Sequence, residues 1–168
     1  MPKRRRAGRP PASLLDPDTP APVAQDVREV DARGRLTIPA RLVQGLSWIE
    51  AAGGASCLLV LDDPGRIAVL PWEKYRDDVL ARRRMLLQDA SKEESQEALL
   101  LLEDRYRRVR LEASGRITLP AAASIHLLND PADRRAFIVR LGDHIELWSV
   151  LYRHAKLRAR SDLFEGLP

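Results

Sequence analysis

The residues of this chain with the clearest capacity for recognition are arginines that stand beside two glycines. Residues 31–39 read DARGRLTIP, and residues 112–120 read EASGRITLP. In both segments glycine can adopt the positive φ of a tight turn, so that the adjacent arginine projects from a fixed backbone. A guanidinium offers paired donors to a phosphate, or to O6 and N7 of guanine. The candidate DNA contacts are Arg33, Arg35 and Arg116, and the turn-forming residues are Gly34 and Gly115.

The chemistry of these arginines leaves a structural alternative open. They can instead pair with the acidic residue that begins each segment, Asp31 or Glu112, and simply keep the turns hydrated. The two segments also differ, because Arg33 of the first is replaced by Ser114 in the second. We therefore expect the first segment to dominate any contact with DNA.

The two segments belong to a repeat with an offset of 81 residues. Five of the nine aligned positions are identical and three more are conservative, so we compared the flanking sequence as well. It repeats in the same order, with an apolar run at 58–61 or 137–139, a turn at 62–65 or 142–143, and a second apolar run. A repeat of this extent indicates two copies of one structural unit.

Each copy is expected to begin with two short alternating strands joined at the glycine. The proline that closes each segment fits the start of a short helix, at 39–46 and 120–128, because its missing N–H needs no partner there. A second hairpin follows in each copy. The predicted fold class is α+β, with two tandem β-hairpin units at 27–72 and 109–151 and a helix or tail at 152–168.

A helical connector is expected at 73–108, since this segment contains no glycine or proline. Ser91 and Glu94 have the spacing of a capping box, which indicates that a second helix begins there. The predicted helices span 73–88 and 92–108. Their apolar residues recur at helical spacing and are expected to pack on the β units.

The segment 1–26 is rich in proline and poor in large apolar side chains, and we expect it to be a disordered arm. It opens with a basic cluster that suits phosphate binding. Residues 6–10, RAGRP, are similar to the Gly-Arg-Pro core of minor-groove AT-hook peptides, with Ala7 where those have arginine. Minor-groove recognition, general attraction to phosphates and no role in DNA binding remain alternatives. The candidate contacts in the arm are Lys3, Arg4, Arg5, Arg6 and Arg9.

No constellation typical of an enzyme is visible, so no catalytic residue, metal ligand or cofactor is predicted. The histidines His126, His144 and His154 are far apart, and residues 62–63, two aspartates before Pro-Gly, indicate a polar turn. The single Cys57 lies in an apolar run and is expected to be buried, which suits a reducing cytoplasm. No apolar stretch is long enough for a transmembrane helix, and the net charge of +4 permits a polyanionic partner.

The paired motifs resemble the signature of MraZ regulators, within the SpoVT/AbrB-like class of swapped-hairpin DNA-binding proteins. The resemblance covers residues 27–151 and includes the duplication, the charged helical segment between the copies and the closing residues 145–148. It implies an interlocked β architecture, a ring-like homo-oligomer and association with the nucleoid. It further implies a repressor of a division and cell-wall gene cluster, which binds repeated sites in double-stranded DNA near its promoter.

Carried over to this chain, the resemblance implies that Arg33 and Arg35 are the best DNA contacts, with Arg116 as the matching residue of the second copy. MraZ regulators usually place an arginine a few residues after each motif proline, where this chain has Val43 and Ser124. Arg41 is therefore a further candidate in the first copy.

Two other functions are compatible with the sequence. One is an AbrB-type antitoxin or another protein-interaction module, which commonly follows one β unit with a long partner-binding tail. Here about 20 residues follow Trp148, and they look helical. The other is a purely structural oligomer, for which retention on DNA would not depend on salt.

Overall fold

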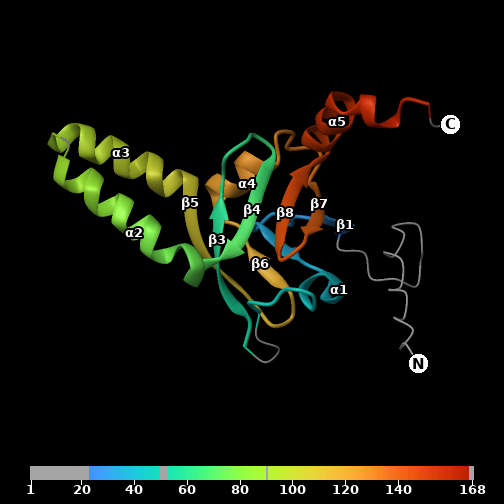
Figure 1. Ribbon diagram of the computed structural model, residues 1–168, viewed down its shortest axis with the longest axis horizontal. Helices are drawn as coiled ribbons and strands as arrows, with labels where there is room; N and C mark the ends of the chain where they lie inside the picture. The colour runs from blue at the N-terminus through green and yellow to red at the C-terminus, as the bar shows by residue number, and fades with distance from the viewer. Residues whose placement is uncertain (1–22, 50–52, 90, 167–168) are drawn as a thin grey trace, which may run out of the picture.

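The computed structural model describes residues 23–49, 53–89 and 91–166. It is an α+β protein in which helices extend and flank one antiparallel sheet (Figure 1). The strands are β1 (Val23–Glu29), β2 (Arg35–Thr37), β3 (Ala55–Val60), β4 (Arg66–Pro71), β5 (Tyr106–Leu111), β6 (Arg116–Thr118), β7 (Arg135–Leu141) and β8 (His144–Ser149). The helices are α1 (Ala40–Val43), α2 (Trp72–Asp89), α3 (Lys92–Arg105), α4 (Ala121–Leu127), α5 (Val150–Ala159) and the short 3₁₀ helix η1 (Ser161–Phe164). No helix in these described segments is long and apolar enough to cross a membrane.

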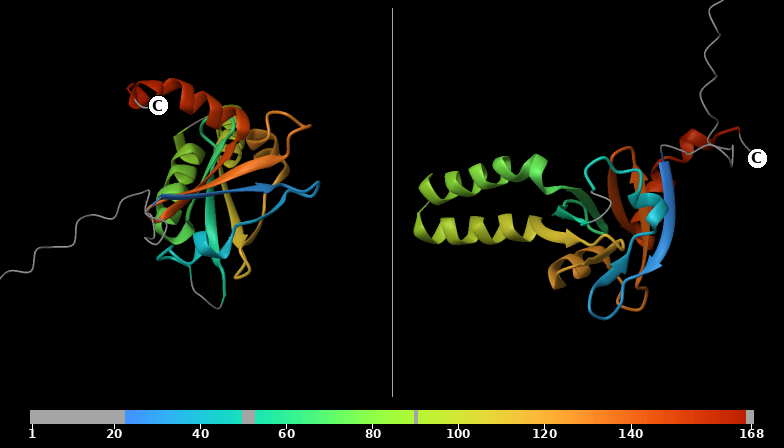
Figure 2. Two further views of the ribbon diagram at one scale, coloured as in Figure 1. Left: turned by 90° about the vertical axis from the view of Figure 1, so that its right-hand side faces the viewer. Right: turned by 90° about the horizontal axis from the view of Figure 1, so that it is seen from below.

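The eight strands form one sheet with the order β1-β7-β8-β4-β3-β5-β6-β2, in which every neighbouring pair is antiparallel. The sheet curls into a nearly closed barrel (Figure 2). Strands β1 and β2 end this order and are joined by the turn at Gly34. There the backbone N–H of Asp31 donates to the carbonyl of Arg35 at 3.0 Å. The turn therefore brings the two edges of the sheet together.

The two repeats are interleaved in this sheet. Strand β1 of the first copy pairs with β7 of the second, and β5 of the second pairs with β3 of the first. Strands β2 with β6, and β4 with β8, also pair across the copies. Leu36 lies opposite Ile117 and Ala68 opposite Glu146, which are equivalent positions of the repeat. One chain thus has an internal two-fold pseudosymmetry.

The tight turns predicted at the two glycines are confirmed, with φ of 76° at Gly34 and 84° at Gly115. Beyond these turns, the two strands of each expected hairpin do not stay paired with each other. Among the described strands, β1 pairs with β7, and β5 meets β6 at the single pair Leu111–Ile117. The strands diverge because β2 and β6 pair with each other, which buries Leu36 against the second copy.

Strand β1 begins at Val23, inside the segment that the sequence assigned to the arm. It pairs with β7 from Val23 opposite Leu141 to Glu29 opposite Arg135. Residues 23–26 are Val-Ala-Gln-Asp, too short and mixed a segment to predict a strand by itself, and they pair with a strand over 100 residues away in sequence. The rest of the predicted arm lies outside the described residues.

The core of the barrel is filled from both copies. Strands β2 and β6 each bury their middle residue and expose the two beside it, as an alternating pattern predicts. Cys57 is also fully buried, as expected, and burial raises the pKa of its thiol to about 12. The largest fully buried side chains are Leu36, Ile38, Leu42, Leu58, Leu59, Ile67, Leu111, Ile117, Leu127, Ile138, Ile145 and Leu147.

The short helices predicted after the motif prolines are present but shorter than expected. Helix α1 begins at Ala40 and α4 at Ala121, so Pro39 and Pro120 are N-cap residues. Both prolines have extended ψ, 140° and 156°, which lets the chain leave β2 or β6 before it turns into the helix.

The two connector helices are confirmed, with the capping box of Ser91 and Glu94 at the start of α3. Helix α3 ends at Arg105, before the predicted residue 108, because Tyr106 is extended and pairs with Val60 as the first residue of β5. The expected packing on the β units holds only at the base of the hairpin, where Tyr75 and Leu102 line a cavity of about 380 Å³. Beyond it, α2 and α3 lie against each other and project from the sheet (Figure 1).

Candidate nucleic-acid interface

Strands β2 and β6 form a short two-stranded ribbon on which the repeated Gly-Arg motifs meet. Arg35 lies opposite Thr118, and Arg116 lies opposite Thr37. All four side chains are exposed, whereas the central pair of the ribbon is buried. The two arginines are therefore related by the internal two-fold axis, which passes through that central pair. The sequence located both residues but did not indicate that they share one surface.

Each turn glycine is required by its neighbours as well as by its φ. The Ile38 N–H donates to the Gly115 carbonyl and the Leu119 N–H to the Gly34 carbonyl, both at 2.8 Å. A Cβ on Gly34 would lie 2.5 Å from the Leu119 carbonyl oxygen, and one on Gly115 would collide with the Ile38 carbonyl oxygen. These two hydrogen bonds between the copies hold both turns in place, so the backbone from which the adjacent arginines project is rigid.

Asp31 organises the first turn. Its Oδ1 accepts the backbone N–H groups of Arg33 at 2.8 Å and Arg35 at 2.9 Å, and its Oδ2 accepts Nε of Arg35 at 2.6 Å. The backbone N–H of Arg35, with its guanidinium and the N–H of Arg33, holds the pKa of Asp31 below its ordinary value. Arg35 therefore forms the ion pair with the acidic residue of its own turn that the sequence analysis gave as the alternative to a DNA contact.

The second turn leaves its arginine without such a pair. Glu112 accepts the Ser114 hydroxyl at 3.4 Å. Within the part of the chain that the structure describes, the guanidinium groups of Arg116 and Arg33 form no hydrogen bond or ion pair. These two cations are exposed and available to an anionic partner.

A hollow of about 420 Å³ connects the two motifs on the surface. It includes Arg28, an exposed cation of β1 that the sequence analysis missed and that pairs with Asp26 at 2.8 Å. No local signal could have identified Arg28, because the equivalent residue of the second copy is Val109 and the strand reaches this site only through the fold. The hollow is lined by Arg28, Glu29, Asp31, Arg35, Thr37 and Arg116.

Arg41 does not line this hollow. Its Nη2 donates to Oδ2 of Asp26 at 2.7 Å and to the carbonyl of Gln25 at 3.0 Å, which ties α1 to β1. Its guanidinium is thus engaged within the chain, although the side chain is 58% exposed. The arm residues Lys3, Arg4, Arg5, Arg6 and Arg9 lie outside the described residues.

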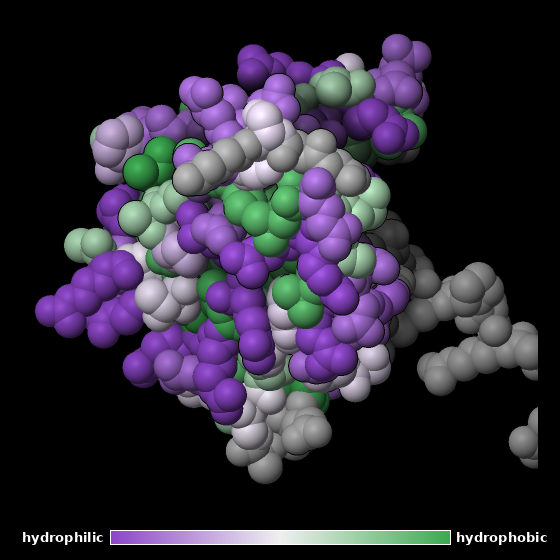
Figure 3. Space-filling view, turned by 90° about the vertical axis from the view of Figure 1, so that its left-hand side faces the viewer, coloured by the Kyte–Doolittle hydropathy of each residue, from purple (hydrophilic) through white to green (hydrophobic). Residues whose placement is uncertain are grey.

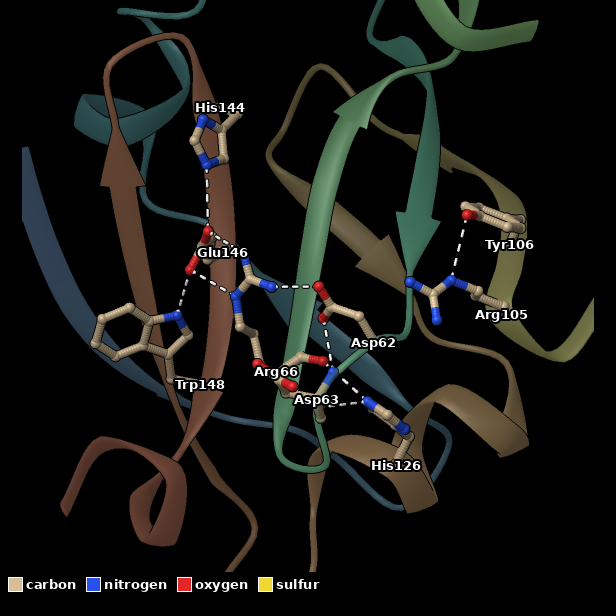
Figure 4. A network of polar contacts seen from close by, with 9 residues as sticks. All are labelled: Asp62, Asp63, Arg66, Arg105, Tyr106, His126, His144, Glu146 and Trp148. Atoms are coloured by element: carbon tan, nitrogen blue, oxygen red, sulfur yellow. Dashed lines mark hydrogen bonds and ion pairs between the residues drawn. The ribbon is translucent and has the colours of Figure 1, made fainter. Parts of the chain in front are cut away.

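A second polar cluster, around the β4–β8 pair, has its partners inside the chain (Figure 4). The guanidinium of Arg66 binds both oxygens of Glu146, at 3.0 and 2.6 Å, and also pairs with Asp62. Burial opposes ionisation of Glu146, but the hydrogen bonds from Arg66 and Trp148 outweigh it and hold the pKa of Glu146 below its ordinary value. Asp62 therefore belongs to a polar turn that holds Arg66, and the pair of Arg66 with Glu146 joins β4 to β8.

The histidines are not brought together. Nε2 of His126 lies 2.8 Å from the Asp63 carbonyl, and Nε2 of His144 lies 3.3 Å from Glu146. His154 is exposed on α5. Among the described residues, no three His, Cys, Asp or Glu side chains are grouped so that they could hold a metal ion.

The chain matches no model of a known protein family, and a search of curated proteins finds no similar sequence. The resemblance to MraZ regulators therefore depends on the paired motifs and their spacing. In the structure the two motifs meet in one two-stranded ribbon, whose flanking arginines and threonines are exposed.

Proposed function

We propose that this protein is a sequence-specific regulator of transcription that binds double-stranded DNA with the β2–β6 ribbon. The observation that carries the proposal is the symmetric pair Arg35 and Arg116, which two glycine turns fix on one exposed surface. A two-stranded ribbon has the width to enter the major groove. Arginine there can bind O6 and N7 of guanine, and threonine can contact a phosphate or a thymine methyl group.

The two-fold pseudosymmetry of the ribbon determines the kind of site that it would read. Related arginines on either side of one axis call for a short DNA element whose halves are related in the same way. The halves of the protein are not identical, since Arg35 is paired with Asp31, whereas Arg116 forms no ion pair with any described residue. The preferred element is therefore an imperfect palindrome, in which the base sequence of one half is recognised more strictly than that of the other.

The remaining parts of the proposal follow from the resemblance to MraZ regulators. The protein acts as a repressor on repeated sites near a promoter, as a homo-oligomer associated with the nucleoid. The basic residues of segment 1–26 add attraction to phosphates that does not depend on sequence.

The proposal is tested by selection of bound duplexes from a random library with the full-length protein, followed by titration of the selected site. Arg35→Ala combined with Arg116→Ala should abolish selection of a defined sequence and weaken binding by about 1–3 kcal/mol for each base that is no longer recognised. Arg84→Ala is the matched control, because Arg84 is exposed on α2 and its side chain makes one hydrogen bond among the described residues, to the Leu80 carbonyl at 3.3 Å.

Two outcomes would contradict the proposal. One is selection of no sequence by the unaltered protein. The other is equal binding by the double variant and by Arg84→Ala. Retention on DNA that does not change with salt would instead favour the protein-interaction module or the structural oligomer.

A further inference from the structure

Strand β5 carries arginines on its outward face, beside the second turn. Leu111 of β5 pairs with Ile117 of β6, and both side chains are buried in the core. Because side chains alternate along a strand, Arg108 and Arg110 lie on the outward face together with Arg116 of β6. All three arginines are exposed. The basic surface of the ribbon therefore continues onto β5, which leads from α3 toward β6 (Figure 1).

The contacts that Arg108 and Arg110 make within the protein leave their charges unbalanced. Nη2 of Arg108 donates to Oγ of Ser56 at 3.1 Å, and its guanidinium lies 5.2 Å from the centroid of the Trp72 ring. Nη2 of Arg110 donates to the Gly53 carbonyl. Within the described ranges of the chain, neither guanidinium forms an ion pair. Both cations are therefore available to an anionic partner.

The same contacts bring the two guanidinium groups together at the end of β5 that leads into the second turn. Ser56 lies opposite Arg110 in the pairing of β3 with β5, so its hydrogen bond draws Arg108 along the strand toward Arg110. A hollow of about 390 Å³ lies beside Arg110. Glu73 lines this hollow, but it is paired with Arg76 at 2.9 Å, so its charge is already balanced. We call this surface, defined by Arg108 and Arg110, the β5 flank.

The equivalent surface beside the first turn has a different charge. The repeat offset of 81 residues places Val27 and Glu29 at the positions of the two β5 arginines, and both are exposed. Arg135 lies opposite Glu29 on β7, but Asp133 binds its guanidinium at 2.8 and 2.9 Å. We call this surface, defined by Val27 and Glu29, the β1 flank. The two-fold pseudosymmetry of the fold is thus not a symmetry of charge.

A polar and positively charged surface is typical of protein that contacts DNA. Figure 3 looks onto the side from which α2 and α3 project and shows hydrophilic side chains over most of this face. Arginine binds phosphate oxygens through paired donors and reads no base sequence when it does so. The β5 flank therefore suits the backbone of a duplex that extends past the ribbon.

We propose that Arg108 and Arg110 bind DNA phosphates beyond the element that the ribbon reads. The protein then covers more of the duplex on the side of the second copy than on the side of the first. This inference rests on the proposed DNA-binding function and adds to it an off-centre footprint. The β5 flank contributes affinity, and the choice of sequence stays with the ribbon.

Salt titration measures how many phosphates the β5 flank binds. Arg108→Gln combined with Arg110→Gln removes both cations and keeps polar side chains. On a duplex with one selected element, the slope of log affinity against log salt should flatten by about 1.8, or about 0.9 for each phosphate released. Selection from a random library should still return the same element, because the ribbon is unaltered. Arg135→Gln is the matched control on the other flank and should leave the slope unchanged.

Hydroxyl-radical footprinting locates the contacts on the duplex. With the unaltered full-length protein, protection should extend further beyond the half of the element that Arg116 reads than beyond the other half. Arg116→Ala identifies that half, because it relaxes the selection of bases there. In the double variant of the β5 flank the extension should be lost, while the element itself stays protected.

Transfer of the two cations to the β1 flank gives the converse test. Val27→Arg combined with Glu29→Arg should steepen the salt slope by about 1.8 and extend protection on the side of the first copy. Val27→Gln combined with Glu29→Gln is the control, which removes the carboxylate and adds no cation. Circular dichroism melting checks that every variant folds.

Two results would overturn the inference while the proposed function stands. They are a slope in the double variant of the β5 flank no flatter than that of Arg135→Gln, and a footprint of the unaltered protein centred on the selected element. Selection of no defined sequence by the unaltered protein would instead contradict the proposed function, and this inference with it.

Discussion

The turn at residues 31–39 and the turn at 112–120 share a backbone and differ in electrostatics. Both glycines have positive φ, and the carbonyl of each accepts an equivalent backbone hydrogen bond from the other copy. Asp31 captures Arg35 in the first turn, whereas Arg116 in the second has no such partner among the described residues. Duplication therefore preserved the geometry that closes the ribbon and allowed its charges to diverge.

The largest expected effect tests whether the two turns are equivalent in structure. Gly34→Ala and Gly115→Ala should each lower the free energy of unfolding by roughly 2–5 kcal/mol, because positive φ strains alanine and its Cβ meets a carbonyl oxygen. Gly142→Ala is the control, since Gly142 has φ of 60° and nothing within 4 Å of an added Cβ. Urea unfolding measures all three. A loss of unfolding free energy at either turn no greater than that of Gly142→Ala would contradict the close approach of the two motifs inferred from the structure.

The next effect tests which arginine contributes more to DNA binding. When Arg35 binds DNA it must first leave its exposed ion pair with Asp31, which offsets part of the free energy gained from the DNA contact. Arg116→Ala should therefore weaken binding to the selected site more than Arg35→Ala, by up to about fivefold. This expectation reverses the sequence-based one, in which the first segment dominates. Fluorescence anisotropy at fixed salt decides between them, and equal effects of the two substitutions would contradict the reasoning from the ion pair.

A smaller effect would follow from exchange of the residues that precede the two glycines. Arg33→Ser should flatten the dependence of log affinity on log salt, and Ser114→Arg should steepen it, each by about 0.9 if the number of phosphates bound changes by one. Titrations at several salt concentrations measure the slopes. Unchanged slopes would show that this position of the turn does not reach the backbone of DNA.

The smallest effect concerns the pH dependence of the first turn. The pKa of Asp31 lies below its ordinary value of 3.8 in the folded protein, so its ionised form stabilises the fold above about that pH. The contribution should be lost as the pH falls through the folded-state pKa. The stability difference between the unaltered protein and Asp31→Asn should therefore shrink as the pH falls below 3.8 and through the lower folded-state pKa. Glu112→Gln serves as the comparison at the second turn.

Much of the local structure could be predicted from the residues because its causes are local. The positive φ at Gly34, the capping box at Ser91 and the two connector helices each depend on neighbours within a few positions. The end of α3 at Arg105 could not be predicted, since Tyr106 is extended only because β3 is available to pair with it. The same reason explains why β1 extends into the predicted arm.

For the candidate site, the residue types identify which side chains can recognise an anion, and the repeat shows that they occur twice. The folded chain is needed to see that Arg35 and Arg116 share one ribbon, that Arg28 joins them and that Arg41 is tied to Asp26. The repeat specifies each turn, but the copies interleave because the short strands β2 and β6 can bury their central residues only against each other. Pairing between segments 81 residues apart is a property of the whole barrel, and no local pattern contains it.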